Sequence, residues 1–416
     1  MQKTKLLMFI ICFIISLSSF ASKNKFSDFE LTQTVPEGTS LKQPNMKWTR
    51  DVWVDMVNGA QKNICFGSLY LYSKKGKSLE LFIDALKKAA ERGIKIKIIL
   101  DKTLYYLSKD TVASLKGIKN IEIRVLPMNK ITGGVMHAKY MVVDNENVYV
   151  GSSNFGWTAM KQIHNIGVRI RNRELASTIL MIFNLDWKMC KLGSLTEHPG
   201  VYRKLPPVDA PVVSVERPIN IKYNDETLSI HPAFSPKIMN PDCVDWGQDQ
   251  FVKLINKAKK EAVFQVMSYS PAKGYGFVGY WDALEVALRK AAVRGVKIKF
   301  IVSNWNNNKP NIDFVKSLAA VPNIDVKISS IPQLKDNFIP YTRVEHCKYF
   351  VIDDDLTWIG NGNWEWSYFN NTRDIDIIIH GKGPAKQLKD MFIQDWNGPY
   401  VEKIDLNKEY HPPKIS

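Results

Sequence analysis

The sequence predicts an α/β fold made of two similar halves, each a mixed β-sheet flanked by helices, related by a pseudo-twofold axis. The main observation is an internal repeat. Residues 79–100 read LELFIDALKKAAERGIKIKIIL, and residues 281–302 read WDALEVALRKAAVRGVKIKFIV. Each segment begins as an amphipathic helix, ends that helix at Arg-Gly, and continues into a strand in which lysines alternate with apolar residues.

The elements on either side of these helices repeat in the same order. Upstream, residues 56–72 (MVNGAQKNICFGSLYLY) parallel residues 254–270 (LINKAKKEAVFQVMSYS), and each stretch reads as a helix followed by a strand. Downstream, residues 137–144 (HAKYMVVD) parallel residues 346–353 (HCKYFVID). Helices and strands alternate in both copies, which predicts two α/β units with a site where they meet.

Composition and prolines suggest how the chain is divided. We expect a signal peptide because Lys3 and Lys5 precede a short apolar run and small residues at positions 19 and 21. An uncleaved anchor is the alternative, although a bilayer span needs about 20 apolar residues. A proline-rich stretch reads as an extended connector between the copies. The predicted segments are a signal peptide (1–21), an N-terminal arm (22–45), a first half (46–198), the connector (199–224) and a second half (225–416).

The composition favours a globular protein with a polyanionic partner. Of 416 residues, 45% are hydrophobic and 24% are charged, which is typical of a soluble protein. The formal net charge is +16, and removing residues 1–21 takes away only two lysines. Such a surplus favours nucleic acid or anionic lipid headgroups, although a merely basic soluble protein is the alternative. The sequence has no CxxC pair, which argues against a zinc site. An exported chain could form disulfides.

A polar pattern of identical spacing occurs once in each copy. It sets a histidine, a lysine two residues later, an aspartate, a glycine and an asparagine at fixed intervals. The first copy supplies His137, Lys139, Asp144, Gly151 and Asn154, and the second supplies His346, Lys348, Asp353, Gly360 and Asn363. A single histidine in an apolar strand is usually a core residue, but two matching patterns favour a site over that alternative.

Strand geometry and phosphate chemistry give this pattern a meaning. Side chains two residues apart share one face of a strand, so His137 and Lys139 project together, away from Ala138 and Tyr140. Lysine and asparagine can bind phosphate oxygens. One histidine can act as nucleophile while the other acts as acid, so we expect neither metal nor cofactor. We count the histidines, lysines and aspartates of both motifs as the catalytic set, with a turn-fixing role for Asp144 and Asp353.

The duplicated pattern resembles the phospholipase D superfamily, and most closely the animal phospholipase D3/D4 branch of lysosomal single-stranded nucleic acid exonucleases. The likeness runs from about residue 33 to residue 400. It includes the words TVPEG, GSSNFGWTAMKQ, RVEHCKYFVIDD and WIGNGNWEWSYF. The resemblance implies a covalent phosphohistidine intermediate, chemistry without metal, and often a homodimer.

Two departures from this family pattern concern the surroundings of the histidines. Asn361 stands where relatives often keep a hydroxyl residue, whereas the first copy has Ser152. Relatives also often carry an acid 11 residues past the motif asparagine. The second copy has Asp374 there, and the first has Asn165. If that acid serves the other copy, Asp374 supports His137 as nucleophile and leaves His346 as general acid, with the reverse assignment open. Ser152, Asn154, Asn363 and Asp374 form the predicted phosphate-binding or supporting set.

Two loops suggest how a substrate would be held. Residues 73–78 (SKKGKS) are basic, and residues 271–282 (PAKGYGFVGYWD) are aromatic and rich in glycine. Lysines that follow a backbone and rings that stack on bases are typical of single-strand binding. Core packing is the alternative for each ring, and the second loop could instead dip into a lipid surface. The predicted substrate-binding residues are Lys74, Lys75, Tyr275, Phe277 and Trp364.

Three hypotheses for the function remain at this point. The first is a nuclease, most simply an exonuclease, on single-stranded DNA or RNA. The second is a phospholipase D that hydrolyses or transfers phospholipid headgroups, with contact to an anionic membrane surface. The third is a non-enzymatic binding protein, which the complete histidine and lysine set argues against. Charge and resemblance favour the first, in a secreted, periplasmic or lumenal protein.

Overall fold

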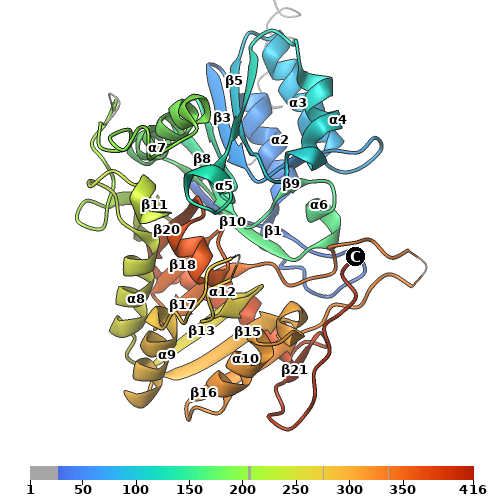
Figure 1. Cartoon of the computed structure of the whole chain (residues 1–416), viewed down its shortest axis with the longest axis vertical. Coiled ribbons are helices and arrows are strands. Elements are labelled where there is room, and N and C mark those ends of the chain that lie inside the picture. The colour runs from blue at the N-terminus through green and yellow to red at the C-terminus, as the bar shows by residue number, and fades with distance from the viewer. Residues whose placement is uncertain (1–26, 205–207, 275, 336) are drawn as a thin grey trace, which may run out of the picture.

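The computed structural model of the protein describes residues 27–204, 208–274, 276–335 and 337–416 (Figure 1). They form two α/β halves that lie one above the other along the long axis of the molecule, coloured blue to green and yellow to red. Each half contains one large mixed sheet with helices packed against it, which confirms the predicted fold class. The predicted signal peptide lies outside the described residues.

The first half is built on an eight-stranded sheet. The last three strands in the order given below are parallel to one another, because helices return the chain between them. The other pairs are antiparallel, except the first pair in that order, which is short and parallel. In sheet order the strands are β2 (Lys47–Trp48), β1 (Phe29–Thr34), β10 (Asn165–Arg171), β8 (Asn147–Gly151), β7 (Tyr140–Val143), β3 (Asn63–Ser68), β5 (Lys95–Asp101) and β6 (Ile121–Leu126). The helices are α2 (Thr49–Gly59), α3 (Glu80–Glu91), α4 (Lys109–Leu115), α5 (Met128–Ile131), α6 (Ala159–Gln162) and α7 (Arg173–Leu192).

The second half repeats this plan in a nine-stranded sheet. In sheet order its strands are β11 (Ile219–Tyr223), β12 (Glu226–Ser235), β20 (Asp374–His380), β18 (Leu356–Gly360), β17 (Lys348–Ile352), β13 (Glu261–Val266), β15 (Lys297–Ser303), β16 (Ile324–Ser329) and β21 (Val401–Lys403). The helices are α8 (Gly247–Lys257), α9 (Ala283–Val293), α10 (Asn311–Ala319), α11 (Trp366–Asn370) and α12 (Lys382–Asn397). Two small ribbons pair β4 (Leu71–Tyr72) with β9 (Phe155–Gly156) and β14 (Tyr269–Ser270) with β19 (Trp364–Glu365).

The two sheets match strand for strand. The order β1-β10-β8-β7-β3-β5-β6 corresponds to β12-β20-β18-β17-β13-β15-β16. In the first half β7, which follows the motif histidine, pairs antiparallel with β3, and β3 pairs parallel with β5. In the second half β17, β13 and β15 are paired in the same way. The repeat seen in the sequence is therefore a repeat of whole sheets.

Alternation along the motif strands divides the core into layers. Tyr140 and Val142 of β7 face an apolar cluster that also contains Tyr349 and Val351 of β17, so one core continues across both halves. Met141 of β7 faces a second cluster beneath α2 and α3, and the alternate residues of β17 face a third beneath α8 and α9. The motif strands are thus covered on both faces, and their ends are held firmly where the halves meet.

Two segment boundaries differ from those predicted. The predicted arm contains β1, which pairs with β10 inside the first sheet, so the first half begins well before residue 46. The predicted connector contains β11, the edge strand of the second sheet, which places the end of the connector before Ile219. The partner of β1 lies far away along the chain, which local composition does not reveal, whereas β11 pairs with the next strand, β12.

Two further observations concern cysteines and membranes. Within the described residues all four cysteines are unpaired: Cys65, Cys190, Cys243 and Cys347. The same part of the chain contains no helix that is both long and apolar enough to cross a lipid bilayer.

Candidate active site

The two motif histidines come together where the halves meet. His137 lies just before β7 and His346 just before β17, and their exposed fractions are only 6% and 7%. The main-chain N–H of His137 donates to the carbonyl of Arg373 in the second half, at 3.0 Å. The N–H of His346 donates to the carbonyl of His164 in the first half, at 2.9 Å. Each histidine is therefore fixed by the half to which it does not belong.

The motif lysines lie beside the histidines, as their spacing predicts. Lys139 and Lys348 are fully buried, and each ammonium donates to the carbonyl of its own motif histidine, at 2.5 Å and 2.8 Å. Both charges act on His137. Two ammonium groups from different halves therefore face one small volume, as a site for an anionic phosphate requires.

The two histidines differ in the partner of Nδ1. His137 Nδ1 lies 2.9 Å from Oδ1 of Asp374, the first residue of β20. His346 Nδ1 lies 2.7 Å from Oδ1 of Asn165, the first residue of β10. A carboxylate stabilises a positively charged imidazole, whereas an amide oxygen only orients the ring. The predicted pairing of Asp374 with His137 is present in the structure.

Burial dominates the electrostatics of the site. It lowers the pKa of His137 and His346 well below the ordinary 6.5, and the nearby lysines lower it further. Burial also lowers the pKa of Lys139 well below its usual range and that of Lys348 to about 7. It raises the pKa of Asp374 to about 8, although three cations oppose this shift. A bound phosphate anion would favour the charged form of each base, so anion binding and proton uptake are coupled.

The predicted supporting residues surround this centre. The Ser152 hydroxyl donates to Oδ1 of Asn165 at 3.0 Å, so it braces the residue that orients His346. Asn361, in the equivalent position, donates instead to the carbonyl of Gly151 at 2.6 Å and so joins the two halves. Asn154 and Asn363 are buried, and their Oδ1 atoms have no hydrogen-bond partner among the described residues.

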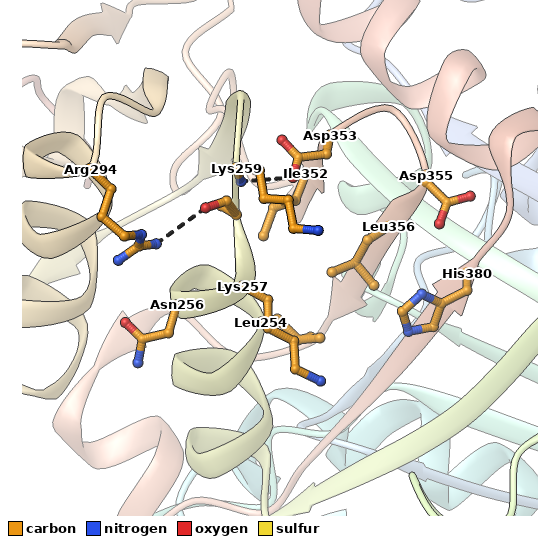
Figure 2. Close-up of a pocket in the computed structure, with 11 residues that line it drawn as sticks. Leu254, Asn256, Lys257, Lys259, Arg294, Ile352, Asp353, Asp355, Leu356 and His380 are labelled. Atoms are coloured by element: carbon orange, nitrogen blue, oxygen red, sulfur yellow. Dashed lines mark hydrogen bonds between the residues drawn. The ribbon is translucent and has the colours of Figure 1, made fainter.

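The motif aspartates lie at the other ends of their strands. Asp144 accepts hydrogen bonds from the main-chain N–H groups of residues 61–63, and Asp353 does the same for residues 259–261. Asp353 borders a surface cavity of about 750 Å³ (Figure 2), whose lining residues include none of the motif histidines or lysines. The predicted turn-fixing role of both aspartates is therefore confirmed, and their place in the catalytic set is wrong, because their carboxylates bind main-chain N–H groups of turns.

The predicted substrate-binding residues differ in where the structure places them. Lys74 and Lys75 are exposed, and the Lys74 ammonium lies 5.9 Å from the ring centroid of Trp157. Phe277 is half-buried, with its ring centroid 4.6 Å from that of Trp366. Trp364 is a correction: its side chain is fully buried in the core of the second half. Tyr275 lies outside the described residues.

Trp157 and Trp366, which the sequence places just past the motifs, are half-buried and occupy matching places, each three residues past its motif asparagine. Two other residues near the site escaped the sequence analysis. His164 and Arg373 also occupy matching places, each directly before the residue that orients a motif histidine. The constant separation between the copies is the signal that could have found this pair.

The comparisons with known proteins agree with this arrangement. A family model described as PLD3/4, PLD-like domain matches residues 39–333. Phospholipase D Z of Dictyostelium discoideum is 28% identical over 397 residues, covering 92% of each chain. The 5'-3' exonuclease PLD3 of Rattus norvegicus is 28% identical over 409 residues, covering 91% of this chain and 81% of its own.

A solved structure has the same fold. The phosphatidylserine synthase of Haemophilus influenzae superposes with a TM-score of 0.59 at 12% identity and covers 85% of each chain, a likeness of fold alone. The family model spans more than half of the sequence and includes the first motif entirely. The chain therefore belongs to the PLD3/4 family of phospholipase D-like proteins.

Proposed function

We propose that this protein is an exported phosphodiesterase that cleaves single-stranded nucleic acid through a covalent phosphohistidine, without a metal ion in the chemistry. The observation that carries the proposal is the unequal support of two histidines in one buried site. His137 has a carboxylate partner, and His346 has an amide partner. The carboxylate favours a histidine that must become positively charged on forming a bond to phosphorus.

The reaction divides into two balanced steps. In the first, the Nε2 lone pair of His137 forms a bond to phosphorus while the bond to the leaving oxygen breaks, and protonated His346 gives its proton to that oxygen. In the second, neutral His346 takes a proton from water, whose oxygen bonds to phosphorus and releases His137. Lys139 and Lys348 stabilise the charge on the non-bridging oxygens throughout.

The surroundings of the site favour nucleic acid as the substrate. The Trp157 ring has two ammonium groups beside it, Lys74 at 5.9 Å and Lys77 at 5.4 Å. The Trp366 ring in the other half has Lys273 at 4.9 Å, and Phe277 packs against it. Rings next to cations suit a strand whose bases stack and whose backbone is negative. The name of one relative, a 5'-3' exonuclease, agrees with this assignment.

A phospholipid substrate is the second candidate, favoured by one observation. The loop after β14 exposes 94% of Val278 and 54% of Tyr280. Apolar and aromatic tips beside a lysine can enter the headgroup region of a bilayer. A relative named Phospholipase D Z agrees with this reading. A membrane-facing loop would also serve a nuclease that works beside an anionic surface.

One experiment separates these candidates. The purified mature protein is given three substrates in the presence of EDTA: single-stranded DNA with a 5′-hydroxyl, the same strand with a 5′-phosphate, and phosphatidylcholine vesicles. We expect cleavage of at least one DNA strand and no choline release. A difference between the two strands would indicate an exonuclease that starts at the 5′ end. Choline release without DNA cleavage would refute the nuclease assignment and leave the phospholipase D activity.

A further inference from the structure

Two buried cations stand in matching places behind the two motif histidines. Arg373 precedes Asp374 in the second half, and His164 precedes Asn165 in the first half. Both side chains have an exposed fraction of 0%. Burying a cation costs free energy unless an anion is paired with it, so each of these side chains is expected to have an anionic partner.

Arg373 joins the second half to the first through both its main chain and its side chain. Its carbonyl accepts the N–H groups of His137 and Ala138, at 3.0 Å and 2.7 Å. Its guanidinium forms a buried ion pair with Asp186 of α7, with Nε–Oδ2 and Nη2–Oδ1 distances of 3.0 Å. The hydroxyl of Tyr202 donates to the same carboxylate at 2.7 Å. The peptide that fixes His137 is therefore locked to a helix of the half that carries His137.

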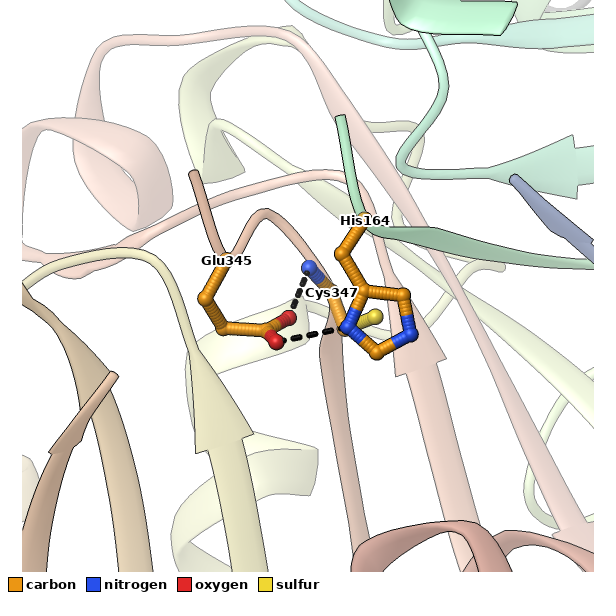
Figure 3. Close-up of side chains that lie close together, drawn as sticks. All are labelled: His164, Glu345 and Cys347. Atoms are coloured by element: carbon orange, nitrogen blue, oxygen red, sulfur yellow. Dashed lines mark hydrogen bonds and ion pairs between the residues drawn. The ribbon is translucent and has the colours of Figure 1, made fainter. Parts of the chain in front are cut away.

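His164 makes the reciprocal connection (Figure 3). Its carbonyl accepts the N–H of His346 at 2.9 Å. Its Nδ1 lies 2.7 Å from Oε2 of Glu345, the residue before His346, and 3.8 Å from Oδ2 of Asp395 in α12. Asp395 stands in α12 where Asp186 stands in α7, relative to the cation that each faces. The peptide that fixes His346 is likewise locked to the half that carries it.

The cluster of His164, Glu345 and Cys347 is an ion pair and not a metal site. Its potential ligand atoms all lie within 4.8 Å of one another. However, Oε2 of Glu345 is already bonded to the imidazole, and Oε1 accepts the main-chain N–H of Cys347 at 2.9 Å. Burial raises the pKa of the Cys347 thiol well above its usual range.

We propose that Arg373 and His164 are positioning residues, each holding the motif histidine of the opposite half through its carbonyl and a buried ion pair that crosses between the halves. This inference rests on the proposed function, because the two histidines have different tasks. Arg373 then acts on the nucleophile His137, and His164 acts on the general acid His346. Each combination of carbonyl contact and buried ion pair is called a clamp below. Loss of the Arg373 clamp and loss of the His164 clamp should impair different parts of the reaction.

The two clamps also differ in their response to pH. The Arg373 guanidinium keeps its charge at any pH at which the protein is folded. Burial lowers the pKa of His164, but the carboxylates of Glu345 and Asp395 outweigh it and raise the pKa to about 9. Cys347 is a further titratable group beside this imidazole. A histidine pKa raised above its unfolded value stabilises the fold fully below about pH 6.5, and this contribution is lost as the pH rises through about 9.

Leaving-group chemistry tests the clamps separately. The assays use the full-length mature chain and measure single-turnover cleavage of a DNA oligonucleotide, whose alkoxide leaving group needs a proton, and of a nucleotide p-nitrophenyl ester, whose leaving group does not. We expect His164→Gln to slow DNA cleavage by roughly 10²-fold at unchanged KM while ester cleavage changes little. The paired replacement Arg373→Met with Asp186→Leu removes both charges of the other clamp. It should slow both substrates equally.

Melting curves by circular dichroism confirm folding of each variant. If His164→Gln does not fold, His164→Gln with Glu345→Gln takes its place, because it leaves neither the cation nor its adjoining carboxylate. Equal losses on both substrates for the His164 variant, or no loss, would overturn the positioning role. A wild-type protein that cleaves the ester but not DNA refutes the nuclease assignment alone. Phosphatidylcholine, whose leaving group is equally poor, then replaces DNA in the same comparison.

Discussion

Asp374 of the second half reaches across to His137 of the first, with its Oδ1 2.9 Å from the imidazole Nδ1. The reciprocal contact, between Asn165 and His346, has a neutral amide in place of the carboxylate. The pseudo-twofold symmetry of the fold is therefore broken in the charge that each histidine receives. On the basis of this asymmetry we propose that the nucleophile lies in the first half, which is a testable assignment.

Replacing each histidine should give different defects with an activated substrate. Both His137→Ala and His346→Ala should abolish cleavage of DNA. With the nucleotide p-nitrophenyl ester, His346→Ala should still release one equivalent of nitrophenol and accumulate a covalent nucleotidyl-enzyme, because the nucleophile remains and the leaving group needs no acid. His137→Ala should release none. Rapid-quench measurement and mass spectrometry of the intact protein detect the burst and the added nucleotidyl group.

A control for this experiment is His380→Ala, since His380 lies at the far end of β20 on the cavity of Figure 2. It should behave as the wild type. A burst in His137→Ala with none in His346→Ala would reverse the two roles.

Replacing Asp374 by asparagine should lower the activity and, as the pH rises, increase the stability relative to the wild type. The variant has the arrangement that Asn165 gives His346, so His137 loses its carboxylate and DNA cleavage should fall by about 10²-fold. Burial raises the pKa of Asp374 from 3.8 to about 8, so its stabilising contribution is present below the unfolded pKa and is lost as the pH rises through about 8. Asparagine does not titrate.

The stability of Asp374→Asn relative to the wild type should therefore increase between pH 4 and pH 8. Thermal unfolding of both proteins across that pH range measures this difference. Asn165→Asp is the matched variant and should lose stability as the pH rises. A wild type and Asp374→Asn whose difference in melting temperature is independent of pH would contradict the raised pKa of Asp374.

The activity of the wild type should decrease as the pH rises through about 8. The reacting state needs a free Nε2 on His137 and a proton on His346. Asp374 is ionised in that state. The reacting state therefore has the same total number of protons as a site in which Asp374 is protonated and both histidines are neutral. Above the Asp374 pKa of about 8 the site is one proton short. Measured in buffers of constant ionic strength, kcat/KM should be highest at acid to neutral pH. A plateau that extends to pH 10 would show that this proton is not needed.

The motif spacing predicted most of the reacting centre. The identical intervals in both copies predict the grouping of each histidine with its lysine, and the position of Asp374 predicts its support of His137. These features follow from strand periodicity and from the meeting of two equal halves. The predicted arm was harder to interpret, because β1 mixes apolar residues with the buried polar Thr32 and Gln33. Its partner, β10, lies more than a hundred residues away.

The aromatic residues show why single positions mislead. Trp364 seemed suited to substrate, but its counterpart in the first half is Phe155, which stacks on Trp53 at 4.0 Å in the core. Both copies therefore require an apolar side chain there. His164 and Arg373 were missed for the opposite reason. The two halves meet the same need for a buried cation with different side chains, so a search for identical residues overlooks them.

The last prediction concerns Trp157 and Trp366 as stacking platforms beside the site. If single-stranded nucleic acid is the substrate, Trp157→Ala should raise KM for an oligonucleotide by roughly tenfold, because stacking of one base contributes about 1–3 kcal/mol. KM for the small nitrophenyl ester should not change. Lys74→Ala should weaken the dependence of binding on salt, because one phosphate contact is lost. Lys119→Ala is the control, since Lys119 lies just before β6 and Lys74 lies after β3 and β4, which places them at opposite ends of the parallel strands. Equal effects of Trp157→Ala on both substrates would mean that the ring packs against the protein and does not contact the strand.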